Sequence, residues 1–174
     1  MSEIGGVRLL VIKRISLDTA LVFKAVRLRA LQESPIAFSS TYAAESQLPD
    51  EEWAKRAQRW SSDGAGAMFL AFDRDVACGI VGSHPAEDNS QCAWIISMWV
   101  DPSFRRAGVG EALINAALEW NKSHDMHEVK LMVTSVNQRA IAFYERMGFR
   151  MTGVTGPYEN DPAITEYEMA LSLV

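Results

Sequence analysis

Residues 94–110 read Trp-Ile-Ile-Ser-Met-Trp-Val-Asp-Pro-Ser-Phe-Arg-Arg-Ala-Gly-Val-Gly, and the rest of the chain is organised around this stretch. Its first seven residues are largely apolar, β-branched and aromatic, a pattern that predicts a strand buried on both faces. Pro102 cannot donate to a strand ladder, so the strand should end near Asp101. Residues 111–122 then carry an apolar stripe with helical spacing, which predicts a helix.

The junction between this strand and this helix predicts a site for an anion. The first N–H groups of a helix lack backbone partners and lie at the positive end of the helix dipole, so they favour a phosphate. Gly108 and Gly110 have no Cβ, which lets a bulky anion approach the backbone and permits positive φ. Arg105 and Arg106 add positive charge beside them. A simple turn remains the alternative, since the stretch matches neither the dinucleotide fingerprint nor the P-loop.

Two motifs lie at a fixed interval in this part of the chain. The first is Arg105-x-x-Gly108-x-Gly110, and the second, residues 137–149, reads Asn-Gln-Arg-Ala-Ile-Ala-Phe-Tyr-Glu-Arg-Met-Gly-Phe. They resemble the Arg/Gln-x-x-Gly-x-Gly/Ala and Asn-x-x-Ala-x-x-Phe-Tyr-x-x-x-Gly-Phe motifs of GCN5-related N-acetyltransferases, in the same order and spacing. In that family the first motif wraps the pyrophosphate of acetyl-CoA. The resemblance covers roughly a third of the 174 residues and implies an acetyl-CoA-dependent N-acetyltransferase.

The same resemblance implies which residues bind the cofactor. In the family, the central strand separates from its neighbour at a bulge, the pantetheine arm adds to the open edge, and a backbone N–H polarises the thioester. Asn137 then either touches the pantetheine arm, caps the following helix, or does both. The implied cofactor-binding set is Met98, Trp99, Val100, Arg105, Arg106, Ala107, Gly108, Val109, Gly110, Glu111 and Asn137.

Tyr144 matches the family's general acid, which protonates the CoA thiolate. A phenol with a pKa near ~10 is a suitable donor to a thiolate of similar basicity. A tyrosine that only packs in the core is the alternative. The general base stays open, because neither the central strand nor residues 129–134 carry a carboxylate. The candidates are ordered water and four residues expected on loops, Glu45, His84, Glu87 and Asp88.

By resemblance, acceptor contacts fall near Phe38 and Tyr42, although the plainer interpretation puts Phe38 in the core and Tyr42 in surface packing. The acceptor is expected to be a small-molecule or protein amine. A non-catalytic acyl-CoA-binding module is the alternative from a different functional class. Dimers are common in the family, which allows a homodimer. His124 and His127 have the spacing of a metal pair, but no third ligand accompanies them, so no metal is predicted.

Composition narrows the class of protein. A chain of 174 residues with 48% hydrophobic content predicts one globular domain over residues 1–174. The net charge of −5 argues against nucleic-acid binding and mildly favours a cationic acceptor. No apolar run approaches the ~18 residues that cross a bilayer, and no signal peptide is visible, so a cytoplasmic protein without a membrane partner is expected. Cys78 and Cys92 should be buried thiols.

The remaining periodicity predicts the order β-α-α-β-β-β-α-β-α-β-β. Strands are expected at 7–12, 67–72, 76–83, 94–100, 128–134, 150–154 and 166–173, and helices at 16–31, 50–60, 111–122 and 138–147. Residues 156–162 should form a turn-rich loop before the last strand. The order predicts an α/β (α+β) fold, with a mixed, mostly antiparallel sheet of about seven strands and helices on both faces.

Overall fold

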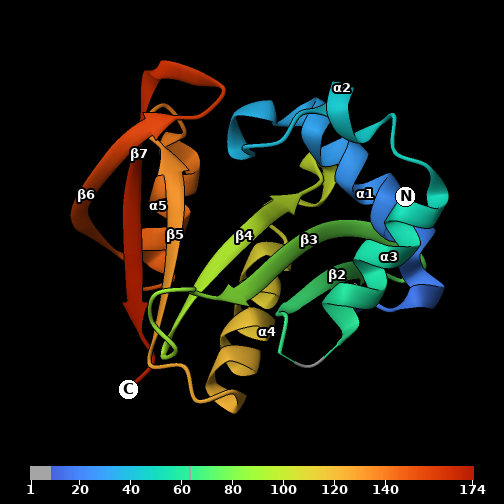
Figure 1. Cartoon of the computed structure of the whole chain (residues 1–174), viewed down its shortest axis with the longest axis horizontal. Helices are drawn as coiled ribbons and strands as arrows, with labels where there is room; N and C mark the ends of the chain where they lie inside the picture. The colour runs from blue at the N-terminus through green and yellow to red at the C-terminus, as the bar shows by residue number, and fades with distance from the viewer. Residues whose placement is uncertain (1–8, 63) are drawn as a thin grey trace, which may run out of the picture.

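The computed structural model describes residues 9–62 and 64–174. Within this part of the chain, seven strands form one sheet in the order β1-β2-β3-β4-β5-β7-β6 (Figure 1). The β4–β5 pair is parallel and the other neighbours are antiparallel, which confirms the predicted mixed sheet. The strands are β1 (Leu10–Arg14), β2 (Ala67–Asp73), β3 (Val76–Pro85), β4 (Cys92–Val100), β5 (Glu128–Thr134), β6 (Arg150–Tyr158) and β7 (Asp161–Ser172).

Helices cover both faces of the sheet, as predicted. One core lies between the sheet and helices α1 and α3, and the other lies between the sheet and helices α4 and α5 (Figure 1). The helices are α1 (Ala20–Glu33), α2 (Tyr42–Glu45), α3 (Asp50–Ser61), α4 (Val109–Ser123) and α5 (Gln138–Arg146), with short 3₁₀ turns at Leu17–Thr19, Pro35–Ala37 and Pro102–Phe104. The short helix α2 is the only helical segment among these five that the periodicity does not predict.

Strand β4 contains a bulge. Gly82 pairs with Ile96 but Ile80 pairs with Trp99, so β4 has one residue more than β3 over this interval. Ser97 adopts a φ of 56°, which is unusual for a residue other than glycine. Side chains in a regular strand alternate with a period of two, and the extra residue breaks that alternation. Trp99 therefore packs in the α1–α3 core.

Strands β4 and β5 lie side by side only at the start of β4 and then separate. They pair only over Cys92–Trp94 of β4, and Figure 1 shows the two strands diverging from there. From Ile95 onward, the β5-facing edge of β4 has no strand partner among the described residues. Residues 96–98 are consequently half-buried, not buried on both faces as the apolar run predicts.

The C-terminal hairpin corrects one prediction. The loop expected at 156–162 is wrong, because β6 continues to Tyr158 and β7 begins at Asp161. β6 lies at the edge of the sheet, where Pro157 need not donate a ladder hydrogen bond. The first strand begins at Leu10 within the described residues, and the earlier part of its predicted range lies outside them.

Candidate active site

A cavity of about 550 Å³ occupies the wedge between β4 and β5. Residues 94–98 of β4 form one wall and residues 131–134 of β5 form the other, while α5 contributes Asn137, Ala140 and Tyr144. The volume lies within the range of about 300–1,000 Å³ that is typical of small-molecule sites. The wedge therefore brings together two segments that are far apart in the sequence.

The glycine loop lies near the wedge, because a Cβ at Gly110 would come within 3.4 Å of Met98, which lines the cavity. Gly108 is the N-cap of α4 with a φ of 79°, and a Cβ at this position would meet nothing within 4 Å. The backbone N–H groups of residues 106–111 donate no hydrogen bond to any described residue. Together with the positive end of the α4 dipole, they form a site suited to an anion.

Gly110 has a different role from Gly108. It lies in the first turn of α4, and a Cβ there would approach the ring of Phe143 to 3.2 Å. The missing side chain therefore lets α4 pack closely on α5, whereas positive φ is needed only at Gly108.

Arg105 fixes the loop to the rest of the protein. Its Nε donates to the carbonyl oxygen of Val100 at 2.8 Å, and its Nη2 pairs with Glu33 at 2.5 Å. Trp99 Nε1 also donates to Glu33, at 2.9 Å. Burial alone would raise the pKa of Glu33, but hydrogen bonds from Arg105, Ser34 and Trp99 lower it to about 2. By contrast, Arg106 is exposed and makes no ion pair within the described residues.

Two hydroxyl groups that line the wedge have no hydrogen-bond partner among the described residues: that of Thr134, which is fully buried, and that of Tyr144, whose side chain is mostly buried. Burial raises the pKa of Tyr144, so the phenol is protonated at neutral pH. A fully buried hydroxyl group normally finds a partner, which the described residues do not provide for Thr134. Sequence reasoning missed Thr134, because only the orientation of β5 shows that its side chain faces the cavity.

Of the two predicted acceptor contacts, the structure brings one to the wedge. Phe38 lines the cavity while it also packs in the core, with the Arg27 guanidinium 4.7 Å from its ring centre. Tyr42 is 39% exposed and lines neither this cavity nor the second cavity described below. Tyr158 of the C-terminal hairpin donates to the carbonyl oxygen of Phe38 at 2.7 Å. The hairpin thus holds the segment that covers the wedge.

The candidate bases lie in very different surroundings. Burial alone would raise the pKa of Glu45, but Arg27, at 2.9 Å, and Arg56 lower it, so its carboxylate accepts a proton poorly. Glu87 and Asp88 are exposed in the turn after β3, away from the residues that line the wedge. His84, which sequence reasoning placed on a loop, lies in β3 and lines the cavity.

Glu166 is a further candidate base that sequence reasoning missed. It lies on β7 directly opposite Thr134 and lines the same cavity as Tyr144. Burial raises the pKa of Glu166, and the nearby Glu159 raises it further. The alternation of the last strand shows that Glu166 lies on its polar face, but only the sheet shows that this face borders the wedge.

The two histidines with the spacing of a metal pair lie in separate surroundings. His124 stacks on Trp120, with ring centres 4.2 Å apart, while His127 lies beside Gln91. The described residues contain no group of three His, Cys, Asp or Glu side chains placed to hold a metal ion. Likewise, none of the helices in the described part of the chain is long and apolar enough for a membrane crossing.

Comparison with known proteins places this geometry in a family. The model of the Acetyltransferase (GNAT) family matches residues 30–149. An uncharacterized N-acetyltransferase of Methanocaldococcus jannaschii is 44% identical over 62 residues, covering 36% of this chain and 27% of that protein. The mycothiol acetyltransferase of Propionibacterium freudenreichii is 32% identical over 108 residues, covering 60% and 33%. The chain thus spans less than half the length of these curated relatives.

A solved structure shows the same fold over nearly the whole chain. The acetyltransferase of the GNAT family from Streptococcus pneumoniae has a TM-score of 0.76 and 21% identity, and the match covers 94% of this chain and 98% of that one. The region that the family model matches contains both sequence motifs and strands β2 to β5, including the bulged strand β4. The chain therefore belongs to the acetyltransferase (GNAT) family of acyltransferase enzymes.

Proposed function

We propose that this chain is a single-domain, acetyl-CoA-dependent N-acetyltransferase that moves the acetyl group to a primary amine by direct attack. One observation carries the proposal. The edge of β4 that has no strand partner among the described residues lies near the N-terminus of α4, whose first N–H groups donate to no described residue. An extended pantetheine arm suits the first feature and a pyrophosphate suits the second. Residues 106–111, with Arg106 as the available cation, would hold the pyrophosphate. Met98 and Asn137, together with the backbone of Trp99 and Val100, would border the arm.

Acetyl-CoA supplies an acetyl thioester, and the chain's own groups would manage the protons of the transfer. The amine nitrogen forms a bond to the carbonyl carbon, and the carbon–sulfur bond breaks. Tyr144 donates its proton to the departing sulfur, a role that its protonated, unpartnered hydroxyl supports. A backbone N–H near Val100 would stabilise the oxyanion.

Glu166 is the proposed general base, because it combines access to the wedge with a raised pKa. An acceptor amine enters largely protonated at neutral pH and must lose a proton before it attacks. A carboxylate with a raised pKa is better matched to that task than the strongly paired Glu45. His84 lines the same cavity and is the second candidate.

The test is release of CoA from acetyl-CoA across a panel of amines, followed by chromatography. A thiol-reactive dye is avoided because of Cys78 and Cys92. Tyr144→Phe should lower kcat about 100-fold while acetyl-CoA binding persists, because only the proton donor is lost. Tyr167→Phe, in β7, is the matched control and should keep full activity.

The outcomes separate the competing functions. Unchanged turnover in Tyr144→Phe would remove Tyr144 from the mechanism. Tight acetyl-CoA binding, with no amine causing release of CoA, would favour the non-catalytic acyl-CoA-binding module. That alternative is supported by the absence of a carboxylate residue in β4. Absence of acetyl-CoA binding would refute the proposed function altogether.

A further inference from the structure

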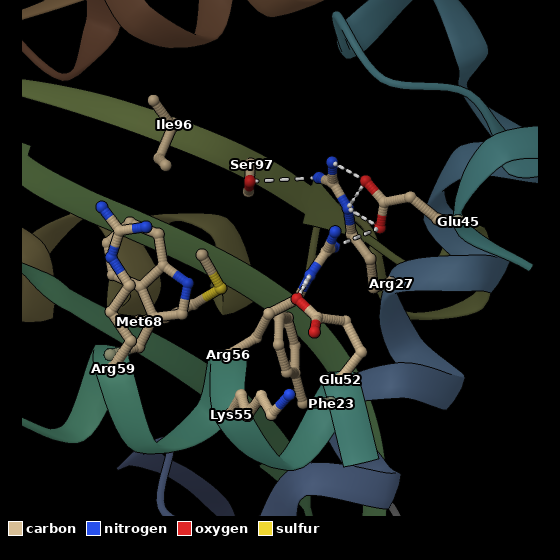
Figure 2. A pocket seen from close by; sticks show the side chains of 11 residues that line it. Phe23, Arg27, Glu45, Glu52, Lys55, Arg56, Arg59, Met68, Ile96 and Ser97 are labelled. Carbon is tan, nitrogen blue, oxygen red and sulfur yellow. Dashed lines mark hydrogen bonds and ion pairs between the residues drawn. The ribbon is translucent and has the colours of Figure 1, made fainter. Parts of the chain in front are cut away.

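A second cavity, of about 420 Å³, lies beneath α1 and α3 on the same sheet (Figure 2). It meets the wedge at the bulge of β4, because Arg27, Ile96 and Ser97 line both cavities. A molecule in the second cavity would therefore reach the bulged strand, along which the thioester is proposed to lie. This contact makes the second cavity a candidate for the rest of the acceptor.

Positive charge is in excess around the second cavity. Four cationic side chains line it, Arg27, Lys55, Arg56 and Arg59, against the two carboxylates of Glu45 and Glu52. The two carboxylates are already paired: Glu45 contacts Arg27 at 2.9 Å and Arg56 at 3.4 Å, and Glu52 lies 3.8 Å from Arg56. The excess stands out in a chain whose net charge is −5.

The excess charge resides on Lys55 and Arg59. Neither side chain makes an ion pair within the described part of the chain. Both are exposed at the rim and come from α3, one turn apart, as Figure 2 shows. They are therefore free to bind an anionic group that enters from solvent.

Arg27, in contrast to Lys55 and Arg59, is held in place by hydrogen bonds. Arg27 is held by Glu45 on one side and donates from Nη1 to the Ser97 hydroxyl at 3.1 Å on the other (Figure 2). Phe23 and Met68 add apolar surface to the lining of the cavity. Such a lining suits a short aliphatic chain that joins the two ends of a small molecule.

We propose that the acceptor is a small primary amine that carries an anionic group, a carboxylate or a phosphate, at its other end. Its anionic group binds Lys55 and Arg59, and its amine reaches the bulge at Ser97. The inference rests on the proposed function and names the substrate class of that site. It reverses the expectation of a cationic acceptor, because the local field at a cavity, not the net charge of the chain, selects the ligand.

The first experiment compares three amines of equal length with wild-type enzyme. δ-Aminovalerate, pentylamine and cadaverine differ only in the end group, which is anionic, neutral or cationic. The kcat/KM for δ-aminovalerate should exceed that for the other two by about tenfold or more, as expected for a charge-assisted pair. Phosphoethanolamine against ethanolamine shows whether phosphate serves as well. A preference for cadaverine or pentylamine would overturn the inference and leave the acetyltransferase proposal intact.

The second experiment assigns the preference to the rim. The double variant Lys55→Glu/Arg59→Glu should lose about tenfold or more in kcat/KM for δ-aminovalerate, with the KM for acetyl-CoA and the rate with pentylamine unchanged. Lys122→Glu, an exposed cation of α4, is the charge control and should leave all values unchanged. An equal rate with δ-aminovalerate in wild type and double variant would refute the assignment.

A binding measurement keeps the inference testable if none of these amines is acetylated. Calorimetric titration of δ-aminovalerate into CoA-saturated protein should give binding that the double variant loses. No binding to wild type, while CoA itself binds, would overturn the inference about the acceptor. Failure to bind CoA would instead refute the proposed function, so the two failures are distinguishable.

Discussion

Replacement of Glu33 with Gln should loosen the loop that is proposed to hold the pyrophosphate. Glu33 lies at the end of α1, and its carboxylate accepts from Arg105 at 2.5 Å and from Trp99 at 2.9 Å. Arg105 in turn donates to the carbonyl oxygen of Val100 at 2.8 Å. These contacts tie α1, the end of β4 and the loop before α4 together. Glutamine keeps the size of the side chain and removes only its charge.

The pKa of Glu33 sets an upper limit on the stabilisation. A decrease from 4.5 to about 2 corresponds to about 3 kcal/mol at neutral pH. The Glu33 side chain is 34% exposed and that of Arg105 is 22% exposed, so solvent screens the pair. We therefore expect a loss of about 1–2 kcal/mol in the free energy of unfolding for Glu33→Gln at neutral pH.

The pH dependence gives the prediction its sign. Because the pKa is lower in the folded protein, the stabilisation is complete above 4.5 and is lost as pH falls from there toward about 2. Urea denaturation followed by tryptophan fluorescence should show that the free energy of unfolding differs between wild type and variant at neutral pH. This difference should become smaller as the pH falls over this interval. The KM for acetyl-CoA should also rise, because Arg105 no longer fixes the loop.

Glu119→Gln is the matched control, since Glu119 is exposed on α4 and makes no ion pair among the described residues. It should change neither the free energy of unfolding nor its pH dependence. If Glu33→Gln behaved like Glu119→Gln, or if its gap to wild type were the same at every pH, the reasoning about this ion pair would be refuted.

Three further variants probe the two ends of the wedge. Gly108→Glu should weaken acetyl-CoA binding at least about tenfold by calorimetry. The control Gly153→Glu, at a glycine with a similarly positive φ and equally open surroundings, should not weaken it. Equal affinities of the two variants for acetyl-CoA would argue against a pyrophosphate at this loop. Glu166→Gln should lower kcat/KM about 100-fold and abolish the acid limb of the pH–rate profile. Glu159→Gln should only move that limb to lower pH, because Glu159 raises the pKa of Glu166. An unaltered pH–rate profile in Glu166→Gln would exclude Glu166 as the general base. Tyr158→Phe should cost about 1–2 kcal/mol in urea denaturation and raise the KM of the acceptor without affecting that of acetyl-CoA.

Local pattern predicted the elements of this fold well. The strand at 128–134, the hairpin between β2 and β3 and the helix capped by Asn137 have the expected positions, because each depends on side-chain periodicity or a local cap. Asn137 Oδ1 accepts from the N–H of Ala140 at 3.2 Å, as a cap should. Gly148, which directly follows the helix predicted at 138–147, has a φ of 97°, as is common after the end of a helix.

Local pattern failed where distant segments decide the outcome. Proline and glycine made residues 156–162 resemble a loop, but the edge position of β6 tolerates them in a strand. Glu166 and Thr134 are ordinary strand residues in the sequence, and only the register between β7 and β5 places them together at the wedge. Arg105 resembles a phosphate ligand by position, yet Glu33, far from it in the sequence, pairs with its charge.

The sequence by itself determined the family, the order of strands and helices, and the loop with unpaired N–H groups, because motifs and periodicity are properties of neighbouring residues. Only the tertiary structure decided the bulge at Ser97, the wedge between β4 and β5, and the basic cavity beside it. These features depend on pairing between strands and on charges contributed by α1, α2 and α3. No local pattern encodes such relations, because they arise when separate segments meet in space.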